Sequence, residues 1–473
     1  MTKLSQNNTP AIEIPAATAA YANFAKTLDF DSIPDDVIEI AKEQAVATIG
    51  SCLGGTNLPG GTALAQGLAI MGTSDKGTLF GRHERLPAPS AALYNAATAQ
   101  IIDWDDWVLI SHVGGCVVPT AFAAAENANA SGREIIAAII IGNEIAGRTS
   151  RAIQRGAYLG NGLPNHQIET PLVAGRLMGL NELQMRRAVG HSAFMAMENC
   201  HLGWTSDSKT LINGLPAMWG IVSASLAKAG LVGNQDMVEH PAGYLSTVSE
   251  EVDYAELTKG LGDEWYTRTL HTKRHPSCAY NLSAIECAIE IRRKNPDFDP
   301  NKIAKIIIEC PGVTVYVGTR YQAMQPDIYE QIRSGALSHV GLCFDAGFGV
   351  MAALVDGELT YRQYLNECIF SPELQRLRPL VEFHTNAEMQ KRYYTEYKYG
   401  SRLEIIMEDG SRHVEERIQL IGARDRQFDH AEKFLEGARE VLPESQSRKA
   451  IEALRNMESI ADINSISHLF RPK

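Results

Sequence analysis

One stretch of this 473-residue chain, REIIAAIIIGNEIAGR at residues 133–148, is apolar on nearly every side when it is drawn as a helix. Such a helix has no polar face for water and must be buried among other elements. Apolar residues recur at spacings of three and four in the segments around it, as they do in packed helices. These helical patterns cover residues 16–70, 88–101, 118–130, 132–155 and 213–229. The first part of the chain is therefore predicted to be a large all-helical domain with 132–155 as its central helix.

The pattern changes after about Tyr266. The segment KIAKIIIECPGVTVYVG alternates and is rich in β-branched residues, which is typical of a strand. SRLEIIMEDGSRHVEERIQLIG predicts a hairpin with Asp409 and Gly410 as its turn, and helices are expected at 279–293 and 340–355. We therefore predict a mainly α protein in three parts. A helical domain covers 1–266, a smaller α+β lid domain covers 267–424, and a C-terminal segment, 425–473, packs back on the helical domain.

Charge and cysteine placement exclude several kinds of partner and site. The net charge is −12 with no long basic run, so we expect no nucleic-acid partner and no anionic membrane partner. The eight cysteines form no CxxC pair and lie in apolar segments, which favours free thiols over disulfides, zinc or an iron–sulfur cluster. The N-terminus lacks an apolar signal core, and no window reaches 18 consecutive apolar residues. We expect a soluble cytoplasmic protein.

Acidic, aromatic and imidazole side chains are concentrated at the break between two predicted helices. In the segment IIDWDDWVLISHVGGCVVP, Asp103, Asp105 and Asp106 interleave with tryptophans, and His112 follows. Carboxylates are rarely buried unless something pairs with them, so this composition is unfavourable in a core and suited to a site. The alternative is an ordinary loop between helices, with aspartates as caps and a hydrogen-bonded histidine.

Four further stretches carry side chains suited to an anionic substrate. They contribute His166 in a loop bracketed by prolines, Lys209 before a helix, Lys273 and Arg274 at another helix start, and Arg320 with Tyr321 after a predicted strand. A lysine at a helix start is poorly placed against the helix dipole, which favours a functional interpretation as part of a carboxylate cradle. We therefore expect Lys209 and Lys273 to line a cleft. The ordinary alternatives are a hydrogen-bonded loop histidine, a solvated basic turn and an exposed strand end.

Several well-defined motifs are absent from the sequence. We find no GxGxxG loop followed by an acid, no GxxxxGKS/T, no HExxH and no GxSxG. Their absence weakens interpretations as a nucleotide-binding protein, a zinc peptidase or an α/β-hydrolase. The residues alone leave aspartate, histidine and lysine side chains at helix ends, an arrangement that suits proton transfer on an anionic substrate, and no metal site is predicted.

The chain resembles the MmgE/PrpD family over nearly its whole length. FGRHERLPAPSAALYNAATAQIIDWDDW and the following HVGGCVVPTAFAAAE are similar to a family block that carries DxDD and a histidine, and GNEIAGR follows as in the family. SDSKTLINGLPAMWGIVSASLAKAGLVG and TKRHPSC resemble two further blocks and place Lys209 and Lys273 on the family's lysines. His166 stands where the family has a loop histidine. The order and spacing of five such blocks form a far more specific signal than any one of them.

The resemblance implies a fold, a chemistry and a set of site residues. The family includes 2-methylcitrate dehydratase, cis-aconitate decarboxylase and iminodisuccinate epimerase, with a helical domain and an α+β lid, usually as a homodimer and with no metal or organic cofactor. The implied catalytic residues are Asp103, His112, His166, Lys209, Lys273 and Tyr321, and we add Trp107, Arg274 and Arg320 as substrate-binding residues. The lysines would hold carboxylates and stabilise an enolate-like charge. A histidine would be the general base or acid, with Asp103 orienting an imidazole.

The sequence also departs from the family pattern. Trp107 replaces the usual Thr, Val113 follows His112 in place of proline, Ala96 follows Asn95 in place of glycine, and no histidine follows Pro276 within a few residues. Trp107 offers only an indole N–H and cannot donate a proton at neutral pH, whereas loss of hydroxide needs an acid. Poor dehydration of 2-methylcitrate is therefore expected.

Two functional hypotheses follow. The first is a cofactor-independent lyase or isomerase that abstracts a proton next to a carboxylate of a small di- or tricarboxylate, leading to dehydration, decarboxylation or epimerisation. The alternative is a non-catalytic carboxylate-binding or structural relative of the family. We also expect a homodimer, because the apolar helices at 132–150 and 213–229 need more covering than one small domain gives.

Overall fold

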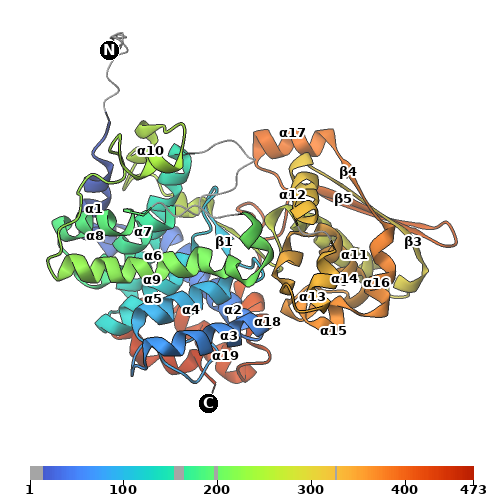
Figure 1. The fold of residues 1–473 in the computed structure, drawn as a ribbon, viewed down its shortest axis with the longest axis horizontal. Helices are drawn as coiled ribbons and strands as arrows, with labels where there is room; N and C mark the ends of the chain where they lie inside the picture. The colour runs from blue at the N-terminus through green and yellow to red at the C-terminus, as the bar shows by residue number, and fades with distance from the viewer. Residues whose placement is uncertain (1–13, 154–164, 196–200, 325–326, 473) are drawn as a thin grey trace, which may run out of the picture.

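The computed structural model describes residues 14–153, 165–195, 201–324 and 327–472, with the side chains of 201 and 320–324 left outside the description. Figure 1 shows a large helical body beside a smaller body that contains a sheet. The expected class, mainly α with a smaller α+β part, is confirmed. The large body contains α1 Ala17–Thr27, α2 Asp35–Thr56, α3 Pro59–Leu68, α4 Ala88–Gln100, α5 Gly114–Ala128, α6 Gly132–Ala152, α7 His166–Leu177, α8 Glu182–Ser192, α9 Leu211–Lys228 and α10 Tyr244–Val248.

The helix α6 lies at the centre of the large body, as its apolar pattern predicts. Ser131 caps it by accepting a hydrogen bond from the N–H of Glu134 at 3.3 Å. Every isoleucine between Ile135 and Ile145 is fully buried. The expectation that this helix needs a second subunit to cover it is therefore wrong, because other elements of the same chain surround it.

The helix α9 differs, because one side of it stays at the surface. Its residues Leu211, Leu215, Met218 and Val222 are only half-buried. The helical stretch Asp207–Lys228 is long and apolar enough to cross a membrane by length and composition alone, although 56% of its apolar 18-residue part is buried inside the protein. A packed core helix meets the same criterion, so this is weak evidence for a membrane span.

The smaller body is built on a four-stranded mixed sheet in the order β4-β3-β5-β6, where β3 and β4 are parallel and the other pairs are antiparallel. The predicted hairpin is confirmed: Gly410 has φ +85° and Asp409 accepts a hydrogen bond from the N–H of Ser411 at 2.9 Å. The elements are β2 His271–Thr272, α11 Leu282–Lys294, β3 Ile303–Cys310, α12 Gly312–Met324, α13 Ile328–Arg333, α14 Ala346–Asp356, α15 Asn366–Ile369, α16 Pro372–Leu377, β4 Val381–Thr385, α17 Ala387–Glu396, β5 Ser401–Met407 and β6 Arg412–Arg417.

The strand predicted over the whole of KIAKIIIECPGVTVYVG is only half right. The strand β3 ends at Cys310, and the second half of the segment forms the helix α12. Pro311 has no N–H for the sheet ladder, and its carbonyl accepts from the N–H groups of Thr314 and Val315 at 3.0 and 3.4 Å. This turn starts a helix within a β-branched run, so the proline outweighs the β-preference of the residues that follow it.

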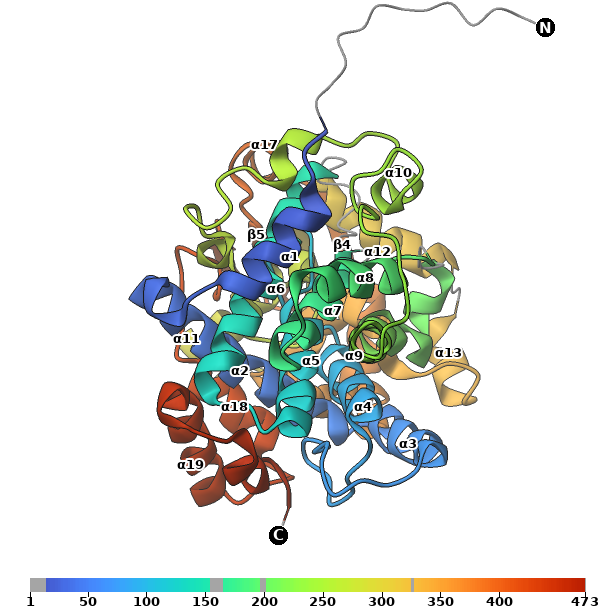
Figure 2. The same cartoon turned by 90° about the vertical axis from the view of Figure 1, so that its left-hand side faces the viewer.

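The two bodies meet at the acidic segment and at the C-terminal helices. The short strand β1 (Asp106–Trp107) pairs antiparallel with β2 of the smaller body. The helices α18 (His430–Ala438) and α19 (Glu444–Arg455) return to the large body, and Figures 1 and 2 both show them beside α2. Phe434 and Leu454 from these helices belong to the core of the large body. The seven cysteines in the described part of the chain are free, as expected.

Candidate active site

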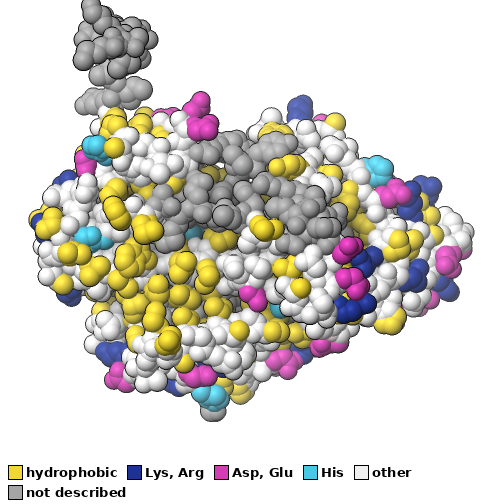
Figure 3. Space-filling view, in the orientation of Figure 1, with side chains coloured by type: hydrophobic (Ala, Val, Ile, Leu, Met, Phe, Trp, Pro, Cys, Tyr) yellow, Lys and Arg dark blue, Asp and Glu magenta, His cyan; other side chains and the backbone are white. Residues whose placement is uncertain are grey.

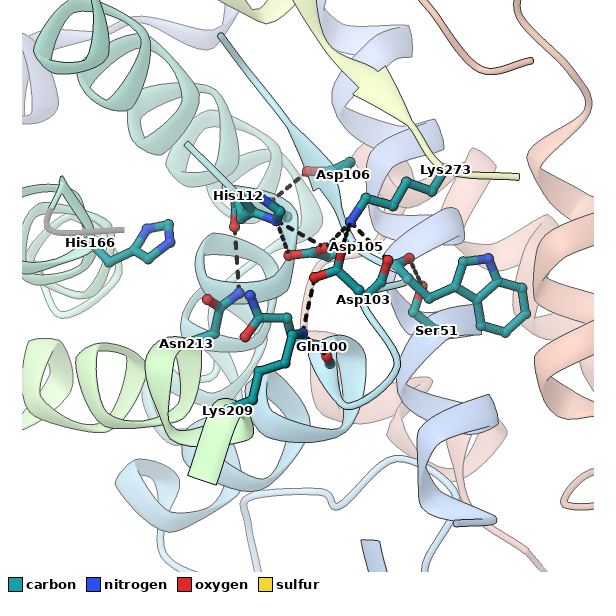
Figure 4. Close-up of polar contacts among 12 residues, drawn as sticks. Ser51, Gln100, Asp103, Asp105, Asp106, His112, His166, Lys209, Asn213 and Lys273 are labelled. Carbon is teal, nitrogen blue, oxygen red and sulfur yellow. Dashed lines mark hydrogen bonds and ion pairs between the residues drawn. The ribbon is translucent and has the colours of Figure 1, made fainter. Parts of the chain in front are cut away.

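The acidic segment lies between α4 and α5, and its three aspartates are buried. Asp103, Asp105 and Asp106 are 2%, 0% and 1% exposed. Asp103 has φ +57°, a left-handed conformation that is uncommon for residues other than glycine. Figure 4 shows two lysines from other parts of the chain, and His112 from the same segment, converging on this cluster of carboxylates. This is the arrangement that buried carboxylates require, because an unpaired charge in a core is strongly unfavourable.

Asp103 forms ion pairs with both lysines that the sequence singled out. Its Oδ1 lies 2.9 Å from Nζ of Lys209, which precedes α9, and its Oδ2 lies 2.6 Å from Nζ of Lys273, which follows β2. Burial raises the pKa of Asp103, but the two ammonium groups outweigh it and hold that pKa below its usual range. Likewise, burial lowers the pKa of Lys273, and Asp103 with Asp105 reverses this to a raised pKa. Asp103 and Lys273 are therefore held in their charged forms.

The expectation that the two lysines line an open cleft is wrong, because Lys209 and Lys273 are only 1% and 0% exposed. The three N–H donors of Lys273 face three acceptors, namely the carbonyl oxygen of Asp103 at 2.8 Å, its carboxylate at 2.6 Å and Oδ1 of Asp105 at 3.1 Å. Lys209 has two oxygen acceptors among the described residues, the carbonyl of Gln100 at 2.7 Å and the carboxylate of Asp103. One donor of Lys209 therefore remains for another acceptor.

His112 is the one group of this cluster that reaches solvent, with 18% of its side chain exposed. Its Nδ1 lies 3.0 Å from Oδ2 and 3.1 Å from Oδ1 of Asp105. Although burial opposes ionisation, Lys273 and His112 lower the pKa of Asp105 well below its usual range. An ionised carboxylate only accepts hydrogen bonds, so we assign a proton to Nδ1 of His112, and Nε2 is the ring nitrogen that remains for proton transfer. The residue that orients the imidazole is thus Asp105, and not Asp103 as the sequence analysis expected.

Asp106 lies in a different environment from Asp103 and Asp105, because its hydrogen-bond partners are Gly114 and Gln44. Its Oδ1 accepts hydrogen bonds from the N–H of Gly114, at the start of α5, at 2.6 Å and from Gln44 at 3.3 Å. Its Oδ2 is buried with no hydrogen-bond partner among the described residues. Burial and the neighbouring Asp105 raise the pKa of Asp106 to about 7. Lys433 of α18 is also fully buried, and burial lowers its pKa to about 7.

His166 begins α7 and forms a second histidine–carboxylate pair. Its Nδ1 lies 2.5 Å from Oε1 of Glu169, one helical turn further on, and both side chains are completely buried. Nε2 of His166 and Oε2 of Glu169 have no hydrogen-bond partner in the described portion of the structure. Burial raises the pKa of Glu169 despite the opposing effect of His166. In Figure 4 the ring of His166 points toward the acidic cluster without joining its hydrogen bonds.

The remaining predicted residues are placed less directly. Trp107 is 4% exposed and stacks on His271 of β2 with a centroid distance of 5.0 Å. Arg274 is ion-paired with Glu436 of α18 at 2.8 Å. Arg320 and Tyr321 fall within α12, but their side chains lie outside the described residues. The roles of all four in substrate binding or catalysis stay predictions.

A metal ion would compete with the lysines at this site. One ligand atom from each of Asp103, Asp105 and His112 lies within 4.8 Å of the others, which is a spacing that three ligands of one ion can have. Both oxygens of Asp103 already face ammonium groups, and Nδ1 of His112 faces a carboxylate. The two lysines thus provide the positive charge that an ion would otherwise bring.

Individual roles at this site were not predicted from the sequence for three residues, namely Glu169, Asp105 and Lys433. Glu169 could have been found from its spacing, because a carboxylate three residues after His166 lies on the same helical face. Asp105 could have been separated from its neighbours only by knowing which aspartate faces His112. Lys433 gives no local signal, because it comes from a charged helix more than three hundred residues away in the chain.

Comparisons with known proteins cover almost the whole chain. The family model for the MmgE/PrpD N-terminal domain matches residues 19–257, and that for the MmgE/PrpD C-terminal domain matches residues 275–459. Lys273 lies just outside both matches.

Three individual relatives are similar at low identity. A cis-aconitate decarboxylase of Aspergillus terreus (strain NIH 2624 / FGSC A1156) is 26% identical over 59% of this chain and 61% of its own length. The human cis-aconitate decarboxylase is 23% identical over 97% of this chain and 95% of its own. The cis-aconitate decarboxylase-like protein oryM of Aspergillus oryzae (strain ATCC 42149 / RIB 40) is 22% identical over 95% and 96%. The match thus spans less than two thirds of the Aspergillus terreus protein.

Proposed function

The chain belongs to the MmgE/PrpD family, and from this premise we propose that it is a cofactor-independent lyase or isomerase of small di- or tricarboxylates. The observation that carries the proposal is the His112–Asp105 pair at the solvent-facing edge of a buried, charge-paired cluster. The names of the relatives, cis-aconitate decarboxylases, support a carboxylate substrate. In this proposal the first bond to break is a bond of the carbon that carries a substrate carboxylate.

His112 acts as the general base in this proposal. Its Nε2 takes a proton from the carbon next to a substrate carboxylate, and the electron pair of the broken C–H bond moves into that carboxylate as an enolate-like charge. Asp105 keeps Nδ1 protonated and stabilises the imidazolium, as long as Lys273 holds Asp105 ionised. Lys209 contributes positive charge for the developing negative charge from its buried position beside Asp103. In a decarboxylation the C–C bond to the departing carboxylate breaks instead, and its electron pair becomes the enolate that the same groups stabilise. Imidazolium, which has taken its proton from water, then gives that proton to carbon.

Decarboxylation or epimerisation fits this chain better than dehydration of 2-methylcitrate. Epimerisation requires a base and delivery of a proton to the opposite face of the enolate. Decarboxylation requires an acid that protonates carbon, and both reactions require positive charge beside the enolate. Loss of hydroxide also requires an acid at the leaving oxygen, and Trp107 cannot serve as one. Its ring is instead buried against His271 and lies within cation–π distance of Lys273, at 5.9 Å.

A non-catalytic, carboxylate-binding or structural relative is the second candidate. The observation that favours it is the saturation of Lys273, whose donors all face acceptors of the protein itself. A charge cluster that is already balanced can hold two domains together without any substrate. The two candidates differ in what they predict for His112, because only the enzyme needs its Nε2.

We further propose a cytoplasmic homodimer that uses the exposed side of α9. This side presents half-buried Leu215 and Met218, and beyond the helix Leu231 and Val232 are 52% and 72% exposed. Figure 3 shows hydrophobic side chains gathered on the surface of the helical body. We expect light scattering at micromolar concentration to give the dimer mass. A Met218→Glu variant should shift it to the monomer, and a monomeric wild type would contradict this proposal.

The test of the proposed activity is a substrate screen by proton NMR in D₂O. Cis-aconitate, citrate, 2-methylcitrate and small dicarboxylates are each incubated with wild-type protein, with His112→Gln, and with His83→Gln as an exposed-histidine control. We expect CO₂ loss or deuterium entry beside a carboxylate for at least one acid, normal behaviour of the control and loss of turnover in His112→Gln. Binding without turnover in every sample would favour the second candidate.

A further inference from the structure

The C-terminal helix α18 contacts both chain segments that build the candidate site. From α18, Lys433 donates a hydrogen bond to the carbonyl oxygen of Trp104 at 2.6 Å, and its ammonium lies 5.3 Å from the centre of the Trp104 ring. The same carbonyl accepts from the hydroxyl of Ser51 at 2.7 Å. Trp104 lies between Asp103 and Asp105, so Lys433 holds the segment that carries both carboxylates.

Glu436, three residues further along α18, contacts the other segment. Its Oε2 lies 2.8 Å from Nη1 of Arg274, which is the residue after Lys273. Glu432, one turn earlier, lies 3.5 Å from the same guanidinium. The indole N–H of Trp104 donates to the carbonyl oxygen of Arg274 at 3.2 Å. Trp104, Arg274 and α18 therefore form one closed set of contacts behind the Asp103–Lys273 pair.

Tight packing fixes α18 against α2 and so fixes the position of Lys433. A Cβ atom on Gly437 would stand 1.9 Å from the carbonyl oxygen of Gly50, and one on Gly50 would stand 2.6 Å from Cα of Phe434. Only glycine allows such an approach of two helix backbones. Lys433 and Gly437 are four residues apart and share a helix face, so the contact that joins the helices also directs Lys433 inward.

We propose that α18 is a positioning element of this site, in which Lys433 holds the aspartate segment and Glu436 holds the Lys273 segment. The geometry points to this role because the lysine and the glutamate act on two segments about 170 residues apart that together form the Asp103–Lys273–Asp105 contact. Lys433 touches the backbone of Trp104 and not the reacting groups, so it is a positioning residue. Its effect on turnover rests on the proposed function, whereas its effect on the two segments does not.

Hydrogen–deuterium exchange tests the positioning role without any substrate. We expect Lys433→Met to raise amide exchange in peptides covering 101–110 and 271–278 together, with the β5–β6 hairpin unchanged. Glu436→Gln should loosen 271–278 more than 101–110. Lys449→Met is the control, because Lys449 is an exposed lysine on α19, in the same C-terminal segment as α18. Its amide exchange should equal that of the wild type. Unchanged exchange in both segments of Lys433→Met, or a uniform increase throughout the helical body, would overturn the proposal.

Steady-state kinetics then separates positioning from simple stability. With a substrate found by the NMR screen, kcat of Lys433→Met should fall at least about tenfold while KM changes by less than about threefold, because misplaced catalytic groups affect the chemical step. Lys433→Arg should restore part of kcat by restoring the bond to the carbonyl. A kcat within twofold of wild type in both Lys433→Met and Glu436→Gln would contradict the role. If Lys433→Met does not fold, Glu436→Gln alone decides whether α18 positions the site. If the wild type shows no turnover, this result counts against the proposed function and not against the exchange result.

Discussion

The two histidine–carboxylate pairs at the candidate site, His112–Asp105 and His166–Glu169, are alike in geometry and opposite in charge environment. Asp105 and Glu169 each accept from Nδ1 of a histidine, at 3.0 and 2.5 Å. Asp105 also faces Lys273, and its pKa falls, whereas Glu169 has burial as the dominant influence, and its pKa rises. Surrounding cations therefore decide whether such a carboxylate stays ionised. This difference favours His112 over His166 as the base of the proposed reaction, because burial opposes charge separation in the His166–Glu169 pair.

The largest effect is expected when the cation beside the His112–Asp105 pair, Lys273, is removed. In Lys273→Met, Asp103 and Asp105 lose a buried partner, and we expect the free energy of unfolding to fall by about 3–5 kcal/mol. Urea denaturation measures this change, and Lys391→Met, an exposed lysine on α17, serves as the control. A loss below about 1 kcal/mol would show that the lysine is not needed to keep these carboxylates buried.

Opposite pH dependence sharpens the comparison. The depressed pKa of Asp105 contributes stability that is present above the unfolded value near 3.8 and is lost as the pH falls. The raised pKa of Glu169 has the reverse sign, so its contribution is present below the unfolded value near 4.5 and is lost as the pH rises above it. Relative to wild type, Asp105→Asn should become less unfavourable toward low pH, and Glu169→Gln should become more favourable toward neutral pH.

We expect these pH-dependent differences to be of the order of 1–3 kcal/mol, since one pKa unit corresponds to about 1.4 kcal/mol. Thermal or urea unfolding of the three proteins between about pH 2 and 7.5 measures them, because the contribution of Asp105 is lost mainly below pH 3.8. Slopes of the same sign for both variants would mean that the two carboxylates do not differ as described.

The smallest expected effect is the rate of water loss from 2-methylcitrate. For this reaction the His166–Glu169 pair would have to supply the acid. Dehydration of 2-methylcitrate requires a proton at the leaving hydroxyl, Trp107 has none to give, and the His166–Glu169 pair lies completely inside the protein. We expect water loss from 2-methylcitrate to stay far below ordinary turnover of order 1–10³ s⁻¹. Rapid dehydration, followed by NMR, would show that a buried pair can reach the substrate as an acid.

From the sequence, the helical body and the residues of the candidate site could be predicted better than the contacts between those residues. The periodicity of α6 and α9 and the Asp409–Gly410 turn follow from local rules that the tertiary structure respects. The segment after Pro311 shows where such rules fail, because a proline ended the strand that β-branched residues favoured. Asp103, His112 and the two lysines were found from composition and resemblance. Which aspartate orients His112, and the arrival of Lys433 from α18, depend on three-dimensional packing that no local pattern encodes.

The central claim is that His112, held by ionised Asp105, is the base that removes the substrate proton. The most direct measurement is the rate of deuterium entry beside a carboxylate, followed by NMR in D₂O for wild type, His112→Gln and Asp105→Asn under identical conditions. We expect His112→Gln to slow this exchange by at least about 10²-fold. Asp105→Asn should slow it as well, because an amide can stabilise the wrong imidazole tautomer. Exchange at the wild-type rate in His112→Gln would contradict the account.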